Sequence, residues 1–297
     1  TNVTAIHSTT EILAEAAEIP PDQQSRFLGI LRQEGGRLAE VAQGLAAYFD
    51  RAGSDPAGAA TPEEELDHFL EAHDHHFPSL DEAPGDASRL APLLEHPLLT
   101  SSQARILAQT HLARYAADAE ALPLQPFHKA ARALAFDPLR LAARFGAPPF
   151  RAFRRLATLR RPGLDAPPMA CLQVNAAGHV EMRRPLPGIP LPRHGTACPL
   201  WPIFEALSRP DQPLARLCRL PDDSEILALA LAQPAEQPAF GQPPRYRAAT
   251  LLVPVIQARA AGLLPRGQNE SPHPVGPGCR ICPRPDCAAR AEASVLG

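Results

Sequence analysis

Three cysteines stand close together near the end of the 297-residue chain, in a run from Gly278 to Cys287. They follow the spacing C-x2-C-x4-C at Cys279, Cys282 and Cys287, which allows three sulfurs to turn toward one centre. The glycine and the two prolines of the run favour an irregular, rigid loop over a helix or a strand. We therefore expect a loop that presents several thiolates together, as metal-binding loops do.

Cys198 is the best candidate for a fourth ligand. It lies in the segment Ala197-Cys198-Pro199-Leu200-Trp201, just before a predicted helix, and the dipole at a helix N-terminus favours a thiolate. Cys-Pro pairs, present here at Cys198 and Cys282, also occur near iron–sulfur clusters. The other two cysteines, Cys171 and Cys218, fall inside predicted strands, which indicates buried and unreactive thiols.

Two kinds of metal centre fit four thiolates. Zinc binds four cysteines tetrahedrally in structural sites, whereas a [4Fe–4S] cluster binds four cysteines and responds to redox change. The spacing alone does not separate the two, and a disulfide or an unligated tail is a third interpretation. All six cysteines lie from Cys171 onward, which favours a metal-binding cytoplasmic protein over a secreted disulfide scaffold.

The pattern of apolar residues divides the chain into two predicted domains, residues 1–165 and 166–297. The first is rich in alanine and has helical spacing, with a helix start at Thr61-Pro62-Glu63-Glu64. The second has the predicted order β-β-α-β-β-β, which is typical of a small antiparallel sheet. We therefore predict an α+β fold, in which a helical N-terminal half precedes a PAS- or GAF-like sensor domain with a cysteine-rich tail.

Residues 137–161 predict two helices around a Gly-Ala-Pro-Pro turn, an arrangement that resembles a helix-turn-helix. Five arginines follow the turn: Arg151, Arg154, Arg155, Arg160 and Arg161. The prolines at the turn and the net charge of −3 argue against insertion into a DNA groove. We interpret the segment as a packed helical hairpin with a solvated arginine face.

No apolar run approaches the roughly 18–20 residues that a membrane span needs. The first residues also lack the basic-then-apolar pattern of a signal peptide. We therefore expect a cytoplasmic protein with no membrane partner. Because the chain begins at Thr1 without an initiator methionine, we interpret it as part of a longer protein.

Four segments together resemble the short-chain fatty acyl-CoA transcriptional regulators. They are the cysteine tail, the run Arg193–Trp201, the predicted hairpin at 169–184 and the phrase Leu156–Gly163. In that family an XRE-type DNA-binding domain precedes a metallopeptidase-like helical domain and a C-terminal ligand-binding domain. The resemblance implies that residues 1–165 are a degenerate metallopeptidase-like domain and that residues 166–297 bind the effector.

The resemblance also implies partners and a cofactor. It implies an acyl-CoA effector, DNA binding through a domain absent from this chain, and a dimer or other homo-oligomer. In some members of the family a [4Fe–4S] cluster is bound by the equivalents of the four cysteines, which favours iron over zinc. Arg193, His194 and Trp201 flank Cys198 and are candidate effector contacts, because guanidinium and aromatic groups suit phosphates and adenine.

We do not expect an enzyme. Zinc peptidases of the related class need His-Glu-x-x-His on one helix face, with the glutamate as base. The corresponding helix here has His111-Leu112-Ala113-Arg114-Tyr115, which lacks the glutamate and the second histidine. The alternative to a sensor is a zinc-stabilised interaction module with no regulatory role.

Overall fold

The computed structural model describes residues 9–10, 13, 20–21, 23–35, 61–192, 197–236, 239–264 and 271–295. Contacts divide the chain into two compact units, Thr1–Thr61 and Pro62–Gly297. Residues 23–35 of the first unit are helical. The fold and the sites below belong to the second unit.

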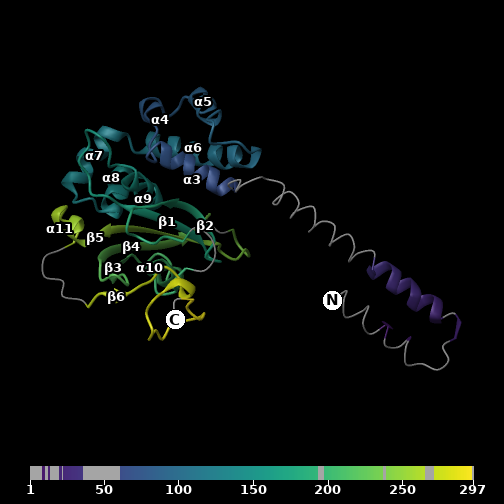
Figure 1. Cartoon of the computed structure of the whole chain (residues 1–297). Coiled ribbons are helices and arrows are strands. Elements are labelled where there is room, and N and C mark those ends of the chain that lie inside the picture. The colour runs from purple at the N-terminus through teal and green to yellow at the C-terminus, as the bar shows by residue number, and fades with distance from the viewer. Residues whose placement is uncertain are drawn as a thin grey trace. The chain divides into compact units, whose positions relative to one another are not determined.

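Helices dominate residues 62–157 of this unit (Figure 1). Their bounds are α3 Pro62–Ala72, α4 Pro78–Glu82, η1 Ala87–Arg89, α5 Ala91–Leu94, α6 Ser102–Ala121, α7 Leu124–Ala133, α8 Pro138–Phe145 and α9 Pro149–Ala157. Local sequence fixes several ends. The Ser101 side chain accepts the N–H of Ala104 at the start of α6, and Asp137 caps α8, which ends at Gly146 in the left-handed conformation. Within the described residues, no helix is long and apolar enough to cross a membrane.

A six-stranded sheet follows, with the strand order β2-β1-β5-β4-β3-β6. The strands are β1 Ala170–Asn175, β2 Val180–Arg184, β3 Leu214–Arg219, β4 Glu225–Pro234, β5 Tyr246–Pro254 and β6 His273–Pro274. The first five pair antiparallel, and the short β6 pairs parallel with β3. Three short helical segments accompany them: α10 Pro202–Ser208, α11 Val255–Ala260 and η2 Cys279–Ile281. The predicted α+β fold with a mostly antiparallel sheet is confirmed.

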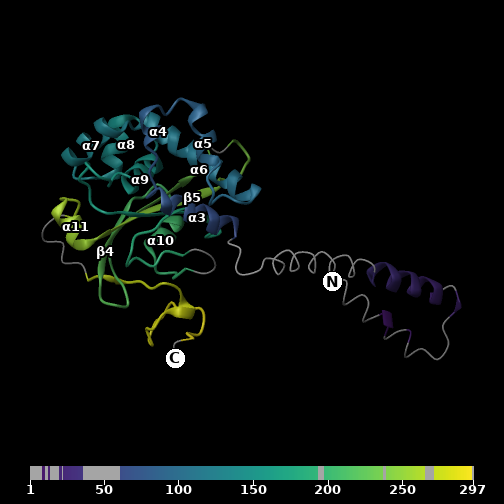
Figure 2. The same ribbon diagram turned by 45° about the horizontal axis from the view of Figure 1, so that its top comes forward.

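The sheet separates two layers, which both views show (Figures 1 and 2). Helices α7–α9 and α11 cover one face and share a core with it, to which Phe153 and Leu251 belong. Helix α10 and the C-terminal segment cover the other face, around Trp201, Ile203 and Val275. A further apolar cluster joins α3, α4 and α6. The boundary predicted at residue 165 falls between α9 and β1 and stays a prediction, because one core continues across it.

The hairpin of α8 and α9 packs as expected, but its arginines do not form a solvated face. The guanidinium of Arg154 donates two 2.6 Å hydrogen bonds to Asp118 on α6. Arg155 is 2% exposed, and its Nη1 lies 2.7 Å from an oxygen of Asp81 on α4. The interpretation of a solvated face was wrong for these residues, because carboxylates of distant segments pair with them inside the molecule.

Candidate functional site

The segment that leads to the cysteine motif is fixed to the edge of the sheet. Val275 is 1% exposed, and its N–H donates to the carbonyl oxygen of Arg219 at 3.0 Å, just beyond the β3–β6 pairing. The indole N–H of Trp201 donates to the carbonyl oxygen of Gly276 at 2.9 Å. The backbone before Cys279 is therefore held by β3 and by the start of α10.

Cys198 lies beside this anchor. It is buried, and its sulfur accepts hydrogen bonds from the backbone N–H groups of Leu200 and Gly276. Burial raises the pKa of the Cys198 thiol, these hydrogen bonds act to lower it, and the nearby Cys279 and Cys282 raise it further. Three of the four predicted ligands are thus near enough to interact electrostatically.

Gly276 provides the space for the sulfur of Cys282. A Cβ atom at position 276 would lie 2.9 Å from Cys282 Sγ, closer than any real contact of that kind. The sulfur of Cys279 accepts the backbone N–H of Ala291 at 3.4 Å. Thiolates are soft ligands, and backbone N–H donors orient them here. Together with the space beside Gly276, they form a suitable donor set for zinc or an iron–sulfur cluster.

The complete ligand set remains a prediction. Cys287 lies on the same loop, half-buried. Across the described ranges, however, no group of three or more His, Cys, Asp or Glu side chains is close enough together to hold a metal ion. The structure supports the predicted ligand set in two ways: the donors are thiols, and Cys198, Cys279 and Cys282 lie near one another.

The surroundings of Cys198 differ from the prediction in one respect. The residue lies in a turn, whereas α10 begins only at Pro202 and has seven residues. The helix dipole therefore does not act on the sulfur, and the two backbone N–H groups take that role. Cys171 and Cys218 are fully buried in β1 and β3, as predicted, and burial raises the pKa of both thiols to about 12.

The predicted effector contacts beside Cys198 find little support. Arg193 and His194 lie outside the described residues. Trp201 is 3% exposed and packs with α10 and the sheet, while its indole N–H is used by Gly276. Trp201 therefore anchors the core and has almost no surface left for an effector.

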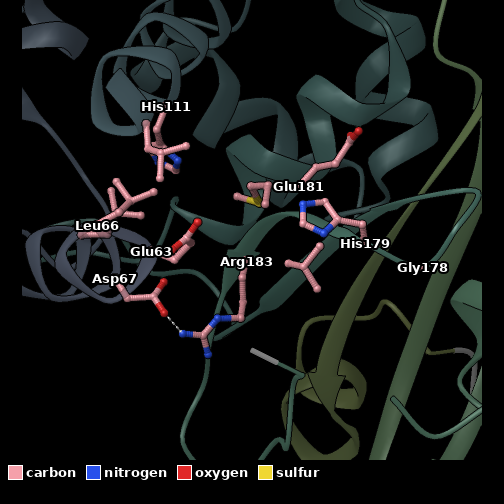
Figure 3. Close-up of a pocket in the computed structure, with 12 residues that line it drawn as sticks. Glu63, Leu66, Asp67, His111, Gly178, His179, Glu181 and Arg183 are labelled. Carbon is pink, nitrogen blue, oxygen red and sulfur yellow. Dashed lines mark hydrogen bonds and ion pairs between the residues drawn. The ribbon is translucent and has the colours of Figure 1, made fainter. Parts of the chain in front are cut away.

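A different cavity offers that surface. A pocket of about 410 Å³ lies between α3, α6 and β2 with its preceding turn (Figure 3). Its apolar lining consists of Leu66, Leu70, Leu107, Val180 and Met182. Two of its carboxylates are already paired: Asp67 with Arg183, and Glu181 with Arg247 at 2.7 Å. Glu63 is the third carboxylate, so the pocket combines an apolar wall with two paired carboxylates and one that forms no ion pair among the described residues.

A guanidinium lies next to this pocket, in an adjoining recess of about 20 Å³. His111 and Met182 also line this recess, beside Arg114 and Arg154. Burial lowers the pKa of His111 to about 4, and the two arginines act in the same direction, so the imidazole is neutral at neutral pH. Arg154 is paired with Asp118, whereas Arg114 forms no ion pair in the described part of the chain. Arg114 is thus available to a ligand.

Sequence reasoning missed this pocket. It singled out His111 only as a remnant of a peptidase motif, and it connected neither Asp67 nor Arg183 with a pocket. The residues come from three segments that are more than 30 positions apart in the sequence. No local pattern predicts that α3 lies beside β2. The packing of α3 on α6 and the ion pair of Asp67 with Arg183 bring them together.

Comparisons with known proteins agree on one kind of relative. Residues 158–296 match the family model described as short-chain fatty acyl coenzyme A regulator, C-terminal. The HTH-type transcriptional regulator RamB of Mycobacterium tuberculosis is 32% identical over 197 residues, which are 65% of this chain and 42% of RamB. The propionyl-CoA carboxylase regulator of Cereibacter sphaeroides is 36% identical over 195 residues, 64% of this chain and 42% of that protein.

A further relative and a solved structure are also similar to this chain. The HTH-type transcriptional regulator PrpR of Mycobacterium tuberculosis is 30% identical over 194 residues, 64% of this chain and 40% of PrpR. A solved structure of a Mycobacterium tuberculosis transcriptional regulator matches with a TM-score of 0.71 at 21% identity, over 80% of this chain and 95% of that one. The latter shows a shared fold. The chain spans less than half the length of the curated relatives it matches.

Proposed function

We propose that this chain is the effector-sensing region of a cytoplasmic transcriptional regulator, because residues 158–296 match the C-terminal domain of the short-chain fatty acyl-CoA regulators. The observation that carries the proposal is this family match, joined to a sheet whose edge strand β2 lines an apolar pocket. DNA binding would use a domain outside this chain, since the relatives are named as HTH-type regulators. Such regulators bind two half-sites as dimers, which is why we propose a homo-oligomer.

We propose a short-chain acyl-CoA as the effector and the pocket of Figure 3 as its site. The acyl chain would lie against Leu107 and Met182, where each buried methylene contributes about 0.8 kcal/mol. The unpaired guanidinium of Arg114 would bind a phosphate or carbonyl oxygen of the same molecule. Neutral His111 lets the wall accept an apolar chain without burying a second charge. The sheet would then act as a sensor of the PAS or GAF kind.

We also propose that Cys198, Cys279, Cys282 and Cys287 hold a [4Fe–4S] cluster, with zinc as the alternative. A bound cluster supplies a redox couple that the protein can sense. The chain's own part is to keep the thiolates in place: the N–H groups of Leu200, Gly276 and Ala291 bind the sulfurs. With zinc, the same loop would be a structural clasp, and sensing would rest on the pocket alone.

Arg114→Gln tests the effector site. We expect the dissociation constant for propionyl-CoA to rise about tenfold or more, because one charge-assisted hydrogen bond to a phosphate or carbonyl is lost. Isothermal titration calorimetry of both proteins measures this directly. Arg105→Gln is the matched control, because Arg105 is exposed on the same helix and lines neither the pocket nor the recess that holds Arg114. Wild-type protein that binds no acyl-CoA would contradict the proposed function.

A further inference from the structure

A second cavity opens where α9 connects to β1. A groove of about 490 Å³ runs between this connection and the segment after β2. It continues into a neighbouring hollow of about 450 Å³, with which it shares Arg160, Asp165 and Pro168. We call the two together the arginine groove, after Arg132, Arg160, Arg161 and Arg184, which line it. None of its lining residues belongs to the pocket of Figure 3.

Two of these arginines are free to act on a ligand. Arg160 and Arg132 are exposed, and neither forms an ion pair with any residue that the structure describes. Arg160 lines both halves of the groove. A guanidinium that lines a concave surface without a carboxylate partner is the group with which proteins bind phosphate, often through two parallel hydrogen bonds.

Arg184 adds a third cation that is only partly compensated. Its side chain is 12% exposed, and its nearest carboxylate oxygen, on Asp74, lies 3.6 Å away. Its Nε is buried and has no hydrogen-bond partner among the described residues. Burial lowers the pKa of Arg184, Asp74 acts to raise it, and Arg160 lowers it again. The two guanidiniums of Arg160 and Arg184 therefore repel each other across the groove, and an anion between them would relieve that repulsion.

The remaining charges do not cancel this excess. The Nη1 atom of Arg161 lies 2.5 Å from a carboxylate oxygen of the buried Asp81, so Arg161 is already paired inside the protein. Without Arg161, the groove has three arginines, Arg132, Arg160 and Arg184, against two carboxylates, Asp74 and Asp165. The other walls are apolar and include Leu164, Met169, Leu186 and several prolines. The groove thus presents cations beside an apolar surface.

We propose that the arginine groove binds the phosphates of a small molecule whose apolar ring or chain packs on the proline and leucine wall. A nucleotide has this chemistry: a flat base for the apolar wall and phosphates for the guanidiniums. The concave shape favours a small ligand over duplex DNA, whose backbone is bound by protruding basic side chains over a long surface. The assignment is independent of acyl-CoA binding in the other pocket.

ADP and inorganic pyrophosphate are the probes. We expect both to bind the wild-type chain in calorimetric titrations, ADP more tightly because of its base. Arg160→Gln should weaken both about tenfold or more, since one guanidinium is lost. Arg160 is exposed, so the variant should keep the wild-type fold and thermal midpoint. The control is Arg144→Gln, an exposed arginine in the last turn of α8 that does not line the groove.

Absence of ADP and pyrophosphate binding, or equal losses in Arg160→Gln and Arg144→Gln, overturns the proposal. So does duplex DNA binding that Arg160→Gln abolishes in a chain that does not bind ADP. Displacement of ADP by propionyl-CoA would also overturn the proposal, because the groove would then be part of the effector site; binding of both together supports a separate nucleotide site. ADP binding by a chain that binds no acyl-CoA would support the groove and contradict only the proposed function.

Discussion

Asp81→Ala is expected to lower the free energy of unfolding by about 3–5 kcal/mol, because it leaves two buried guanidiniums without their carboxylate. The Asp81 side chain is 5% exposed, and its oxygens lie 2.7 Å from Arg155 Nη1 and 2.5 Å from Arg161 Nη1. It also accepts a 2.8 Å hydrogen bond from the hydroxyl of Tyr115. This network joins α4, α6 and the end of α9, and urea denaturation followed by circular dichroism measures its loss.

The control is Glu82→Ala, which removes the next carboxylate along the chain. Glu82 is 73% exposed and pairs with Arg89 at 3.4 Å, so its loss should change stability by less than about 1 kcal/mol. Burial acts to raise the pKa of Asp81, but Arg155 and Arg161 hold it below its ordinary value of 3.8. Its contribution is therefore complete above that pH and is lost as the pH falls through the lower value in the folded protein. A wild-type advantage over Asp81→Ala that persists unchanged in strong acid would contradict the assignment.

Cys282→Ser is expected to abolish metal binding. Anaerobically purified wild-type protein should be brown and contain about four iron and about four sulfide per chain, as a [4Fe–4S] cluster requires. The variant should be colourless and contain almost no iron, because Cys282 is buried against Gly276 and no other described cysteine can replace it there. Visible absorption and iron, sulfide and zinc analysis measure both.

Cys171→Ala is the matched control, since Cys171 is a buried cysteine of β1 outside the motif. It should keep the full metal content even if it costs some stability. One zinc per chain in the wild type would make this a structural zinc site, and the protein would then not sense redox state through it. Equal metal content in wild type and Cys282→Ser would contradict the ligand assignment.

Local chemistry made most elements of the fold predictable. The Thr61-Pro62-Glu63-Glu64 start predicted α3, which begins at Pro62, and the break around Gly146 predicted the end of α8. Alternating or continuous apolar runs predicted β1 to β5. These signals are local because caps, turns and strand patterns act over a few residues.

What the sequence did not reveal depends on contacts between distant segments. The pairing of Arg155 with Asp81 spans 74 positions and cannot be distinguished from a solvated charge in one sequence. The two-residue β6 has no pattern of its own and exists because β3 offers it an edge. The same holds for both cavities, whose walls come from several elements. Spacing predicted the four cysteines as ligands, but it did not show that β6 and Trp201 hold the segment before Cys279 beside Cys198.

Hydrogen–deuterium exchange in the presence and absence of propionyl-CoA tests the central claim most directly, because it reports whether the effector binds and where. We expect slower exchange in α3, in α6 around His111 and in β2 with its preceding turn, which surround the pocket of Figure 3. Residues 214–219 of β3 should change little, since they lie near the opposite edge of the sheet. Unchanged exchange at saturating acyl-CoA, or protection that leaves α3 and β2 unaffected, would contradict the claim that this chain senses acyl-CoA through that pocket.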